Sequence, residues 1–388
     1  MKIAIIAPTY LPALRANTFQ VMKMAQGFVA GGHTVRMVVP TDDLQLEPPK
    51  WDQLAKHYGI ENRFDLEWLF SHNKLRRYDF GLRSVFWARS WHAELIYTRL
   101  TQAAALAAWM GMPTIFEVHD LPQGRFGPIV FRMFLRGRSA SRLVVISRAL
   151  LRALVTHLGV PQSSPFTIVA PDGIDFTRYE NIPSPQEARL AVNQLVTPDL
   201  SLPVNQFTVG YTGHLYPGRG VDMLLKLAAH LPNITFLLVG GEPIDVLKLR
   251  ELVKAQGIEN VVLTGFIDNT DLPYFQAASE VLLMPYQDKV EASSGGDISR
   301  YLSPMKMFEY LACKRAIISS DLPVLREVLN DENAVLLPPQ DVAAWMQTIA
   351  KLRDDPERRE ALANSAFQHA RYYTWDERAK NILNGIQI

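Results

Sequence analysis

The sequence has almost no cysteine and no long apolar run. Cys313 is the single cysteine among 388 residues, so an internal disulfide is excluded and a reducing compartment suits the chain. The longest apolar runs, at 103–110 and 281–285, are far shorter than the roughly 18–20 residues that span a bilayer. The N-terminal residues begin a strand directly, without the apolar segment and cleavage site of a secretory signal. We therefore expect a cytoplasmic protein, either free or peripheral on the inner face of the membrane.

Several cofactor and metal signatures are also missing. The turn after the first expected strand reads Ala7–Pro12 instead of a G-x-G-x-x-G turn, which argues against a nicotinamide dehydrogenase. The sequence has no Walker-type lysine loop. The nine histidines show neither H-E-x-x-H nor paired-cysteine spacing. We expect no cofactor and no metal.

Charge is balanced overall but is not evenly spread. The net charge is +1 and the pI is about 7.9, which lacks the strongly basic footprint of a nucleic-acid-binding protein. The first half nevertheless has basic residues between Lys74 and Arg89, and again between Arg125 and Arg142, where aromatic and aliphatic residues alternate with the arginines. Such a stretch can lie on an anionic membrane surface. A core helix with a solvated basic face is the alternative, and the sequence favours it slightly.

The length predicts two or three domains, and 48% hydrophobic with 20% charged residues fits ordinary globular cores. Short β-branched runs alternate with amphipathic stretches, which predicts an α/β protein with parallel sheets. In the first half, strands are expected near 2–7, 34–39, 94–97, 114–118, 142–146 and 167–170. Helices are expected at 17–30, 101–110 and 148–158.

A second series of strands is expected near 207–211, 234–239, 261–263, 281–284, 316–318 and 334–336. A proline-containing stretch, 182–206, separates the two series, so we place the domains at 1–180 and 181–373. A final helix at 374–388 has no partner strand in its own domain, and we expect it to pack back onto the first domain. The sequence thus predicts two doubly wound, Rossmann-like domains in tandem, with ligands in a cleft between them.

The segment Ser303–Ala312 carries the strongest functional signal. We expect Ser303 to cap a helix whose first-turn proline is Pro304, so that the free N–H groups around Met305 face an anion. Lys306 adds a cation one turn in, and Glu309 lies one further turn along the same face. This layout suits the diphosphate and the sugar hydroxyls of a nucleotide sugar. An ordinary amphipathic helix is the alternative.

Two other segments add to this prediction. Gly213 and His214 begin a glycine-rich turn in which Arg219 could grip phosphate with its fork of donors. His119 follows the expected strand 114–118 and would face the same cleft, in contact with the transferred sugar or the acceptor. A structural histidine paired with a neighbouring carboxylate is the alternative for His119.

Taken in order, these motifs resemble the retaining glycosyltransferases of family 4, with the GT-B fold. The resemblance covers nearly the whole chain. It rests on segments at 97–99, 116–120, 145–147, 170–175, 213–220, 239–241, 263–266, 304–312 and 321–327. It implies transfer of a sugar from a nucleotide-diphosphate donor with retention at the anomeric carbon and without a metal.

The resemblance also implies residue roles. Arg219, Lys306 and the backbone around Gly213 would clamp the diphosphate, with His214 at a position where the family has arginine. Glu309 matches the second glutamate of the family's pair and would bind the ribose. The first glutamate is replaced by Tyr301, and Asp297, in the 293–297 loop, is a hypothetical substitute for contact with the donor sugar.

The nucleotide base is expected near Gly265 and Phe266, with uridine favoured. The acceptor, which is a glycan, a lipid-linked sugar or a small molecule, is expected near Arg15 and Asn17 in the first domain. Two other functions stay open, a nucleotide-sugar epimerase and a non-catalytic nucleotide-sugar-binding protein.

Overall fold

The protein has two compact units. The structure is a computed structural model that describes residues 1–388 except 44, 46, 162–165, 292–295 and 387–388. Unit 1 consists of Met1–Asp172 together with Trp375–Ile388, and unit 2 of Gly173–Thr374.

Over the described residues, unit 1 is built on a seven-stranded sheet with the order β3-β2-β1-β4-β5-β6-β7, and every recorded pairing is parallel. Its strands are β1 Lys2–Ile6, β2 Thr34–Thr41, β3 Asp65–Phe70, β4 Leu95–Thr98, β5 Thr114–Val118, β6 Ala140–Val145 and β7 Thr167–Val169. Its helices are α1 Ala16–Ala30, α2 Trp51–Tyr58, α3 Tyr78–Ser90, α4 Thr101–Trp109, α5 Gly127–Leu135, α6 Arg148–Leu158 and α14 Trp375–Leu383.

Unit 2 repeats this plan with a parallel six-stranded sheet of order β10-β9-β8-β11-β12-β13, counted over the described residues. Its strands are β8 Thr208–Thr212, β9 Thr235–Val239, β10 Val261–Gly265, β11 Val281–Met284, β12 Ala316–Ser320 and β13 Val335–Leu337. Its helices are α7 Pro185–Leu195, α8 Val221–His230, α9 Pro243–Ala255, α10 Leu272–Ala277, α11 Met305–Ala312, α12 Val342–Asp354 and α13 Pro356–Ala370. In each sheet the strand order changes direction next to the first strand of the unit, β1 in unit 1 and β8 in unit 2. Doubly wound sheets bind their ligands at this point.

The sequence predicted two such sheets, and the structure confirms this fold class, but it missed one strand. β3 lies at the edge of its sheet, and within the described residues it pairs with β2 alone. Its sequence, Asp-Leu-Glu-Trp-Leu-Phe, has no β-branched residue, and its side chains are at most partly buried. An edge strand that is half solvated need not form the continuous apolar run by which its buried neighbours are recognised.

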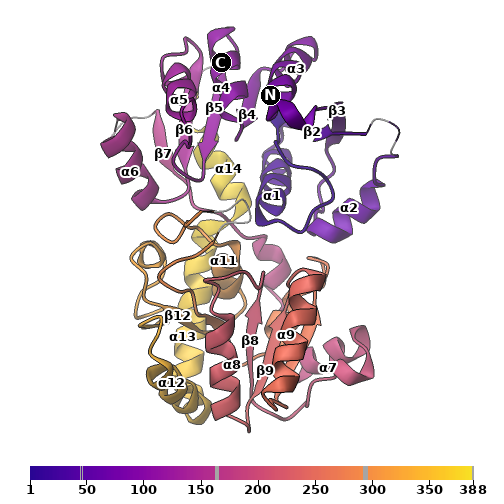
Figure 1. Ribbon diagram of the computed structural model, residues 1–388, viewed down its shortest axis with the longest axis vertical. Coiled ribbons are helices and arrows are strands. Elements are labelled where there is room, and N and C mark those ends of the chain that lie inside the picture. The colour runs from indigo at the N-terminus through magenta and orange to yellow at the C-terminus, as the bar shows by residue number, and fades with distance from the viewer. Residues whose placement is uncertain (44, 46, 162–165, 292–295, 387–388) are drawn as a thin grey trace. The chain divides into compact units, whose positions relative to one another are not determined.

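The final helix, α14, belongs to unit 1. An added Cβ on Gly27 of α1 would lie only 2.8 Å from the carbonyl oxygen of Trp375, so the two helix backbones pack in close contact. Arg142 of β6 donates to the carbonyl oxygens of Asn381, Ile382 and Asn384 at 3.2, 2.5 and 2.7 Å. In Figure 1, α14 is yellow because it lies near the C-terminus, and the helices around it are purple because they belong to the first half of the chain. Unit 1 is therefore completed by a segment that follows unit 2 in sequence.

The division between the units lies at 172/173, eight residues before the expected boundary at 180/181. Residues 173–180 are held by unit 2: Ile174 N donates to Tyr373 O at 2.8 Å, and the Tyr179 hydroxyl donates to Gln276 at 2.8 Å. The expected boundary was placed next to residues 182–206 because of their prolines. The contacts of Ile174 and Tyr179 show that unit 2 already begins before that stretch.

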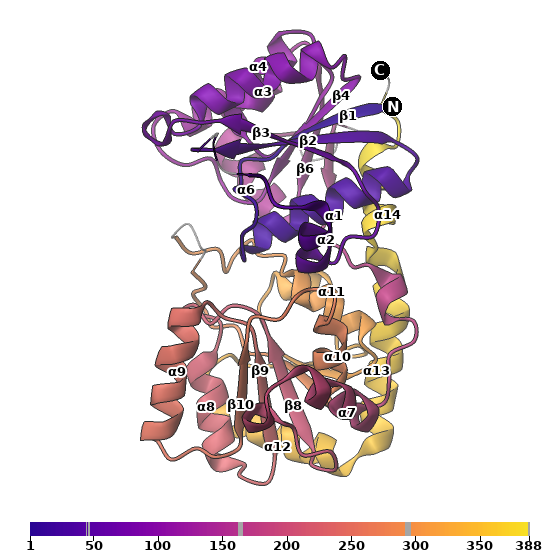
Figure 2. The same cartoon turned by 90° about the vertical axis from the view of Figure 1, so that its right-hand side faces the viewer.

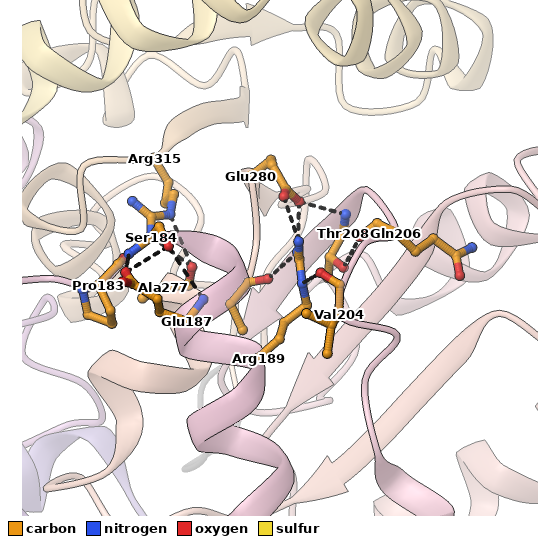
Figure 3. A network of polar contacts seen from close by, with 11 residues as sticks. Pro183, Ser184, Glu187, Arg189, Val204, Gln206, Thr208, Ala277, Glu280 and Arg315 are labelled. Carbon is orange, nitrogen blue, oxygen red and sulfur yellow. Dashed lines mark hydrogen bonds and ion pairs between the residues drawn. The ribbon is translucent and has the colours of Figure 1, made fainter.

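The proline-containing stretch is itself fixed to unit 2 by two buried arginines (Figure 3). Arg189 of α7 pairs with Glu280 at 3.0 Å and donates to Val204 O at 2.8 Å. The same glutamate accepts from the backbone N–H of Thr208, at the start of β8, at 2.7 Å. Arg315 donates to Pro183 O at 2.5 Å and to Ala277 O. This stretch is a bonded part of unit 2.

Candidate active site

The carboxyl ends of β8, β9 and β10 meet at one edge of the unit 2 sheet. Gly213 N donates to Val239 O at 2.8 Å, and Gly240 N donates to Gly265 O at 2.7 Å. Gly213 and Gly240 have φ of +130° and +111°, a region that only glycine adopts at little cost. A Cβ on Gly240 would lie 2.5 Å from Gly213 O. The glycines allow the three strand ends to approach one another, and they bring Gly213 and Gly265 of the predicted site to the same edge.

Lys306 of α11 points toward this edge. A Cβ on Gly213 would lie 2.7 Å from Lys306 Nζ, and the ammonium lies 3.8 Å from the ring centre of Tyr211. Its Nζ is buried and has no hydrogen-bond partner among the described residues. Burial lowers the lysine pKa well below its usual value, and the charge of Arg219 lowers it further, while Glu309 opposes the shift. A buried donor without an acceptor costs about 1–3 kcal/mol or more, so the position favours an anion.

Arg219 supplies a second cation. It lies between Gly218 and Gly220, where added Cβ atoms would come within 2.0 and 1.9 Å of the carbonyl oxygens of Lys289 and Pro285. The glycines thus press this turn against the segment after β11. Arg219 Nη1 donates to the Tyr286 hydroxyl at 3.1 Å.

The two cations lie on one aromatic ring. The Arg219 guanidinium lies 5.3 Å and Lys306 Nζ 5.5 Å from the ring centre of Tyr286. Two positive groups that share one tyrosine repel each other in a site of low dielectric. A ligand with two adjacent negative charges relieves this repulsion, and a diphosphate is such a ligand.

Glu309 lies one turn beyond Lys306. Its Oε2 accepts from Gln276 Nε2 at 2.8 Å, and Gln276 is itself held by Tyr179. The neighbouring Tyr310 hydroxyl accepts from the backbone N–H of Thr212 at 2.7 Å, which fixes α11 to the end of β8. These bonds hold the glutamate in place near Lys306, whose pKa its charge raises. That it binds a ribose stays a prediction.

The other predicted donor residues lie at the same strand ends. His214 O accepts from the Tyr211 hydroxyl at 2.5 Å, and its ring stacks on Tyr216 with centroids 4.6 Å apart. Phe266 follows Gly265 directly after β10 and is partly buried. These positions are compatible with the expected phosphate and base contacts but do not test them.

The expected helix start is off by one residue. α11 begins at Met305, and Pro304 is its N-cap with ψ of 123° and no capping side-chain bond, so Ser303 lies outside the helix. Proline has no N–H and keeps the residue before it extended, which moves the boundary past Ser303. Lys306 consequently lies in the first turn, nearer the positive helix end than expected.

Asp297 is the last residue of the 293–297 loop that was expected to contact the donor sugar, and Tyr301 follows four residues later. Residues 293–295 of that loop lie outside the described residues. Asp297 Oδ1 accepts from Val290 N at 3.1 Å and Ser299 N at 2.9 Å, while Tyr301 N donates to Ile298 O. Burial would raise the Asp297 pKa, but these two backbone donors, the Ser299 hydroxyl and the charge of Arg300 together hold it below the usual range. One oxygen of Asp297 thus closes its own loop, and its contact with a sugar stays a hypothesis.

In unit 1, a buried polar network surrounds Glu117 at the end of β5. Glu117 accepts from the Tyr97 hydroxyl, from Gln20 Nε2 at 2.6 Å and from Arg378 Nη2 at 2.9 Å. It also pairs with His119 Nε2 at 2.5 Å. Burial would raise the Glu117 pKa, but Arg378 and the bond from His119 hold it well below its usual value. The carboxylate is ionised and fully occupied.

This network determines the state of His119. Burial, followed by repulsion from Arg99, lowers the His119 pKa to about 4. At neutral pH the imidazole is uncharged, and because Nε2 faces an ionised carboxylate it carries the proton. Nδ1 then has the free lone pair. His119 is arranged to accept a hydrogen bond from a hydroxyl and not to act as a cationic acid.

Asp172 completes the group at the end of unit 1. Ligand atoms of Glu117, His119 and Asp172 lie within 4.8 Å of one another, close enough to hold a metal ion. Burial raises the pKa of Asp172 to about 7, while Arg378 opposes the shift. Since the guanidinium of Arg378 already lies against Glu117, these carboxylates have a positive partner from the chain itself.

The predicted acceptor residues lie at the start of α1. Arg15 is the N-cap residue and is exposed. Asn17 Oδ1 is buried and has no hydrogen-bond partner among the described residues. Arg99, directly after β4, donates to Asn17 O at 3.4 Å and to Gln20 at 3.2 Å. A chain of contacts thus joins Asn17 to the Glu117 network.

Sequence reasoning gave no role to five residues of this network, namely Gln20, Tyr97, Arg99, Asp172 and Arg378. Arg99 and Asp172 follow closely on strands at the carboxyl edge of the sheet, and that rule could have found them. No sequence signal connects Arg378 to Glu117, because the two are 261 positions apart.

Comparison with known proteins places the chain in a family. Residues 19–178 match the model described as Glycosyltransferase Family 4, and residues 206–355 match the model described as Glycosyl transferases group 1. The two matches fall in successive units and together cover most of the chain. The chain belongs to the family 4 glycosyltransferases. It is accordingly a transferase that uses a nucleotide sugar, as the sequence predicted.

Curated relatives of this glycosyltransferase carry similar names. A D-inositol 3-phosphate glycosyltransferase of Xylanimonas cellulosilytica is 27% identical over 304 residues, which cover 76% of this chain and 67% of the relative. An alpha-galactosylglucosyldiacylglycerol synthase of Streptococcus pneumoniae is 24% identical over 227 residues, or 55% of each chain. The matches thus span about half to two thirds of these relatives.

Solved structures share the fold of this glycosyltransferase. HepE of Anabaena, in complex with UDP, matches with a TM-score of 0.73, 19% identity and 98% of both chains covered. The solved structures that match this chain have the GT-B fold of glycosyltransferases, and this likeness confirms the predicted fold. Across the part of the chain that is described, no helix combines the length and apolar character needed to cross a membrane.

Proposed function

We propose that this glycosyltransferase transfers a sugar from a uridine diphosphate sugar to an acceptor hydroxyl with retention at the anomeric carbon. The observation that carries the proposal is the buried ammonium of Lys306, which has no hydrogen-bond partner among the described residues and shares Tyr286 with Arg219. A pyrophosphate would supply the missing acceptors and the opposing charge.

The chemistry follows from this placement. As the glycosyl carbon–oxygen bond breaks, its electron pair stays with the diphosphate, and charge develops on the phosphate oxygen. Fixed cations at Lys306 and Arg219, with the N–H groups of the first turn of α11, stabilise that charge more in the transition state than in the ground state. The oxygen of the acceptor hydroxyl forms the new bond to the glycosyl carbon, and its proton passes to the departing diphosphate oxygen.

The proposed roles of the other residues build on the same geometry. Glu309, held by Gln276, binds the ribose, and the strand end at Gly265 and Phe266 receives the base. His119 accepts a hydrogen bond from a sugar hydroxyl through Nδ1, and Arg15 and Asn17 contact the acceptor. We propose no metal and no cofactor.

Uridine is favoured by the solved relatives. Structures of HepE, which share this fold, are described as complexes with UDP, UDP-glucose, and UDP with glucose. The acceptor is a glycan, a lipid-linked sugar or a small molecule. The curated relatives are named for an inositol phosphate and for a glycosylated diacylglycerol.

A donor screen tests the proposal. Uridine, guanosine and adenosine diphosphate sugars are incubated with the protein, thermal stabilisation is recorded, and slow donor hydrolysis is followed by release of the nucleoside diphosphate. We expect stabilisation and hydrolysis with a uridine donor, and an α-configured sugar as the first product by NMR. An isomerised, unhydrolysed donor would indicate an epimerase, and stabilisation without turnover a binding protein. A β-configured first product would exclude retention.

A further inference from the structure

Three adjacent helices of unit 1 expose an apolar surface. α3, α4 and α5 lie side by side on one face of the sheet, with α4 in the middle (Figure 1). Figure 2 shows α3 and α4 next to each other on this face. Large side chains on them remain at least 45% exposed: Tyr78, Leu82, Phe86, Trp109, Phe126, Ile129 and Met133. We call these seven residues the apolar face.

The apolar face follows helical periodicity. Tyr78, Leu82 and Phe86 recur every four residues along α3, and so lie on one side of it. Phe126, Ile129 and Met133 are spaced three and four apart on α5 and its N-cap. Trp109 belongs with the α5 group, because its Nε1 at the end of α4 donates to Met133 O at 2.7 Å. A side chain held in this way is a fixed part of the exposed surface.

Positive charge surrounds the apolar face. Arg125, Arg132, Arg136 and Arg138 on and beside α5 are exposed, and Arg89 is exposed at the end of α3. None of these arginines forms an ion pair with a carboxylate in the described part of the chain.

Negative charge is nearly missing from the same elements. Residues 121–171 contain no aspartate or glutamate, and neither do residues 80–93 or 99–116. Asp79 is the acidic residue of α3, and its carboxylate is occupied by Ser71 and by the backbone N–H of His72. The net charge of the whole chain is close to zero, but the surface formed by α3, α4 and α5 is positively charged.

We propose that α3, α4 and α5 form a docking surface for an anionic lipid bilayer. Phe126, Ile129, Met133 and Trp109 enter the boundary between headgroups and acyl chains, while the arginines lie against the lipid phosphates. A nucleic acid would match the charge but would leave the apolar side chains in water. A second copy would bring arginine against arginine. The proposal concerns unit 1 and does not depend on the identity of the donor.

Vesicle sedimentation tests the proposal. The full-length protein is mixed with phosphatidylcholine vesicles, with or without phosphatidylglycerol, at low and high salt. We expect binding to the anionic vesicles at low salt, weaker but measurable binding at high salt, and none to neutral vesicles. Salt screens the arginines and leaves the apolar contribution in place.

Two variants separate the contributions. Arg132→Gln/Arg136→Gln/Arg138→Gln is expected to weaken binding about a hundredfold, since each basic residue near a charged bilayer contributes to partitioning. Phe126→Ser/Ile129→Ser/Met133→Ser is expected to remove the binding that survives high salt. Ile244→Ser/Leu247→Ser, two exposed positions on α9 of unit 2, serves as the matched control. Circular dichroism and donor hydrolysis show that each variant is folded.

Failure to bind anionic vesicles at low salt overturns the proposal, as does equal binding by the α5 variants and wild type. Concentration-dependent dimerisation that the serine variant abolishes, without vesicle binding, would assign the face to a second copy. Binding of single-stranded RNA that the glutamine variant loses and the serine variant keeps, again without vesicle binding, would assign it to nucleic acid.

Discussion

Arg378 of α14 donates to Glu117 of β5 at 2.9 Å, with both side chains almost fully buried. The same guanidinium donates to the carbonyl oxygens of Ala170 and Pro171 at 3.0 and 2.8 Å. The Arg378 side chain thus neutralises Glu117, the central carboxylate of unit 1. It also binds the backbone at the end of the Met1–Asp172 segment of that unit.

Removing that arginine should destabilise unit 1 strongly. We expect Arg378→Met to cost about 3–5 kcal/mol in urea denaturation followed by tryptophan fluorescence, because a buried carboxylate is left without its partner. Lys380→Met is the matched control in the same helix. Lys380 pairs with Glu377 on the exposed surface, where water and salt screen the pair and it contributes little to stability. Equal losses for the two variants would contradict this account.

Substitution of Lys306 should separate stability from binding. We expect Lys306→Met to leave the melting temperature of the free protein unchanged or higher, because it removes a buried charge without a hydrogen-bond partner. UDP affinity should fall about 10- to 100-fold with the loss of a charge-assisted hydrogen bond. Calorimetry measures the affinity, and Lys351→Met, exposed on α12, is the control. A variant that is much less stable but binds UDP normally would assign Lys306 a structural role.

Gly213 should tolerate no side chain. Gly213→Ala places a methyl group 2.7 Å from Lys306 Nζ at a φ of +130°. We expect weaker UDP binding and slower donor hydrolysis. Gly257→Ala is the control, since it also has positive φ but meets nothing within 4 Å, so it carries the backbone strain of about 1 kcal/mol alone. Similar losses of UDP affinity in both variants would show that strain, not proximity to Lys306, is responsible.

Asp172 should make stability depend on pH. Its folded-state pKa is raised to about 7 by burial, so between about pH 4 and 7 the folded state holds a proton that the unfolded state has lost. Its contribution is therefore present at low pH and declines as pH rises. We expect the stability gained by Asp172→Asn to be about 2 kcal/mol larger at pH 8 than at pH 5. Asp52→Asn, exposed on α2, should show no such difference, and a gain independent of pH would refute the assignment.

His119 should remain neutral through the physiological range. With a pKa of about 4, it should show the Nε2–H tautomer in nitrogen NMR spectra from pH 5 to 8. The pH profile of donor hydrolysis should then have no inflection near pH 6.5 that can be assigned to His119. The profiles of wild type and His119→Asn should therefore have the same shape around that pH. Such an inflection would make His119 an acid–base group instead of a hydrogen-bond acceptor.

The sequence predicted those parts of the fold that depend on local pattern. The apolar runs of β1 in unit 1 and of β9 and β11 in unit 2 pointed to the two sheets, because strands buried on both faces are almost wholly apolar. The sequence did not predict β3, because a strand at the edge of a sheet does not need a continuous apolar run. The Ser303 cap failed for a similarly local reason, since proline can itself occupy the cap position.

The candidate site divides in the same way. Lys306, Glu309 and Arg219 stand beside glycine and proline signals, so their surroundings can be read from sequence neighbours. The state of His119 cannot, because it depends on Arg99 and on Glu117, whose charge is kept by Arg378 from far along the chain. Charges buried by the fold have no local signature in the sequence.

The place of α14 in the chain affects how the protein is made. Glu117 and its strand leave the ribosome long before Arg378, with the whole of unit 2 translated in between. Until Arg378 is translated, the nascent first half lacks the arginine that pairs with Glu117 and the helix that packs against α1. The half that is synthesised first is therefore completed only after the second has been translated.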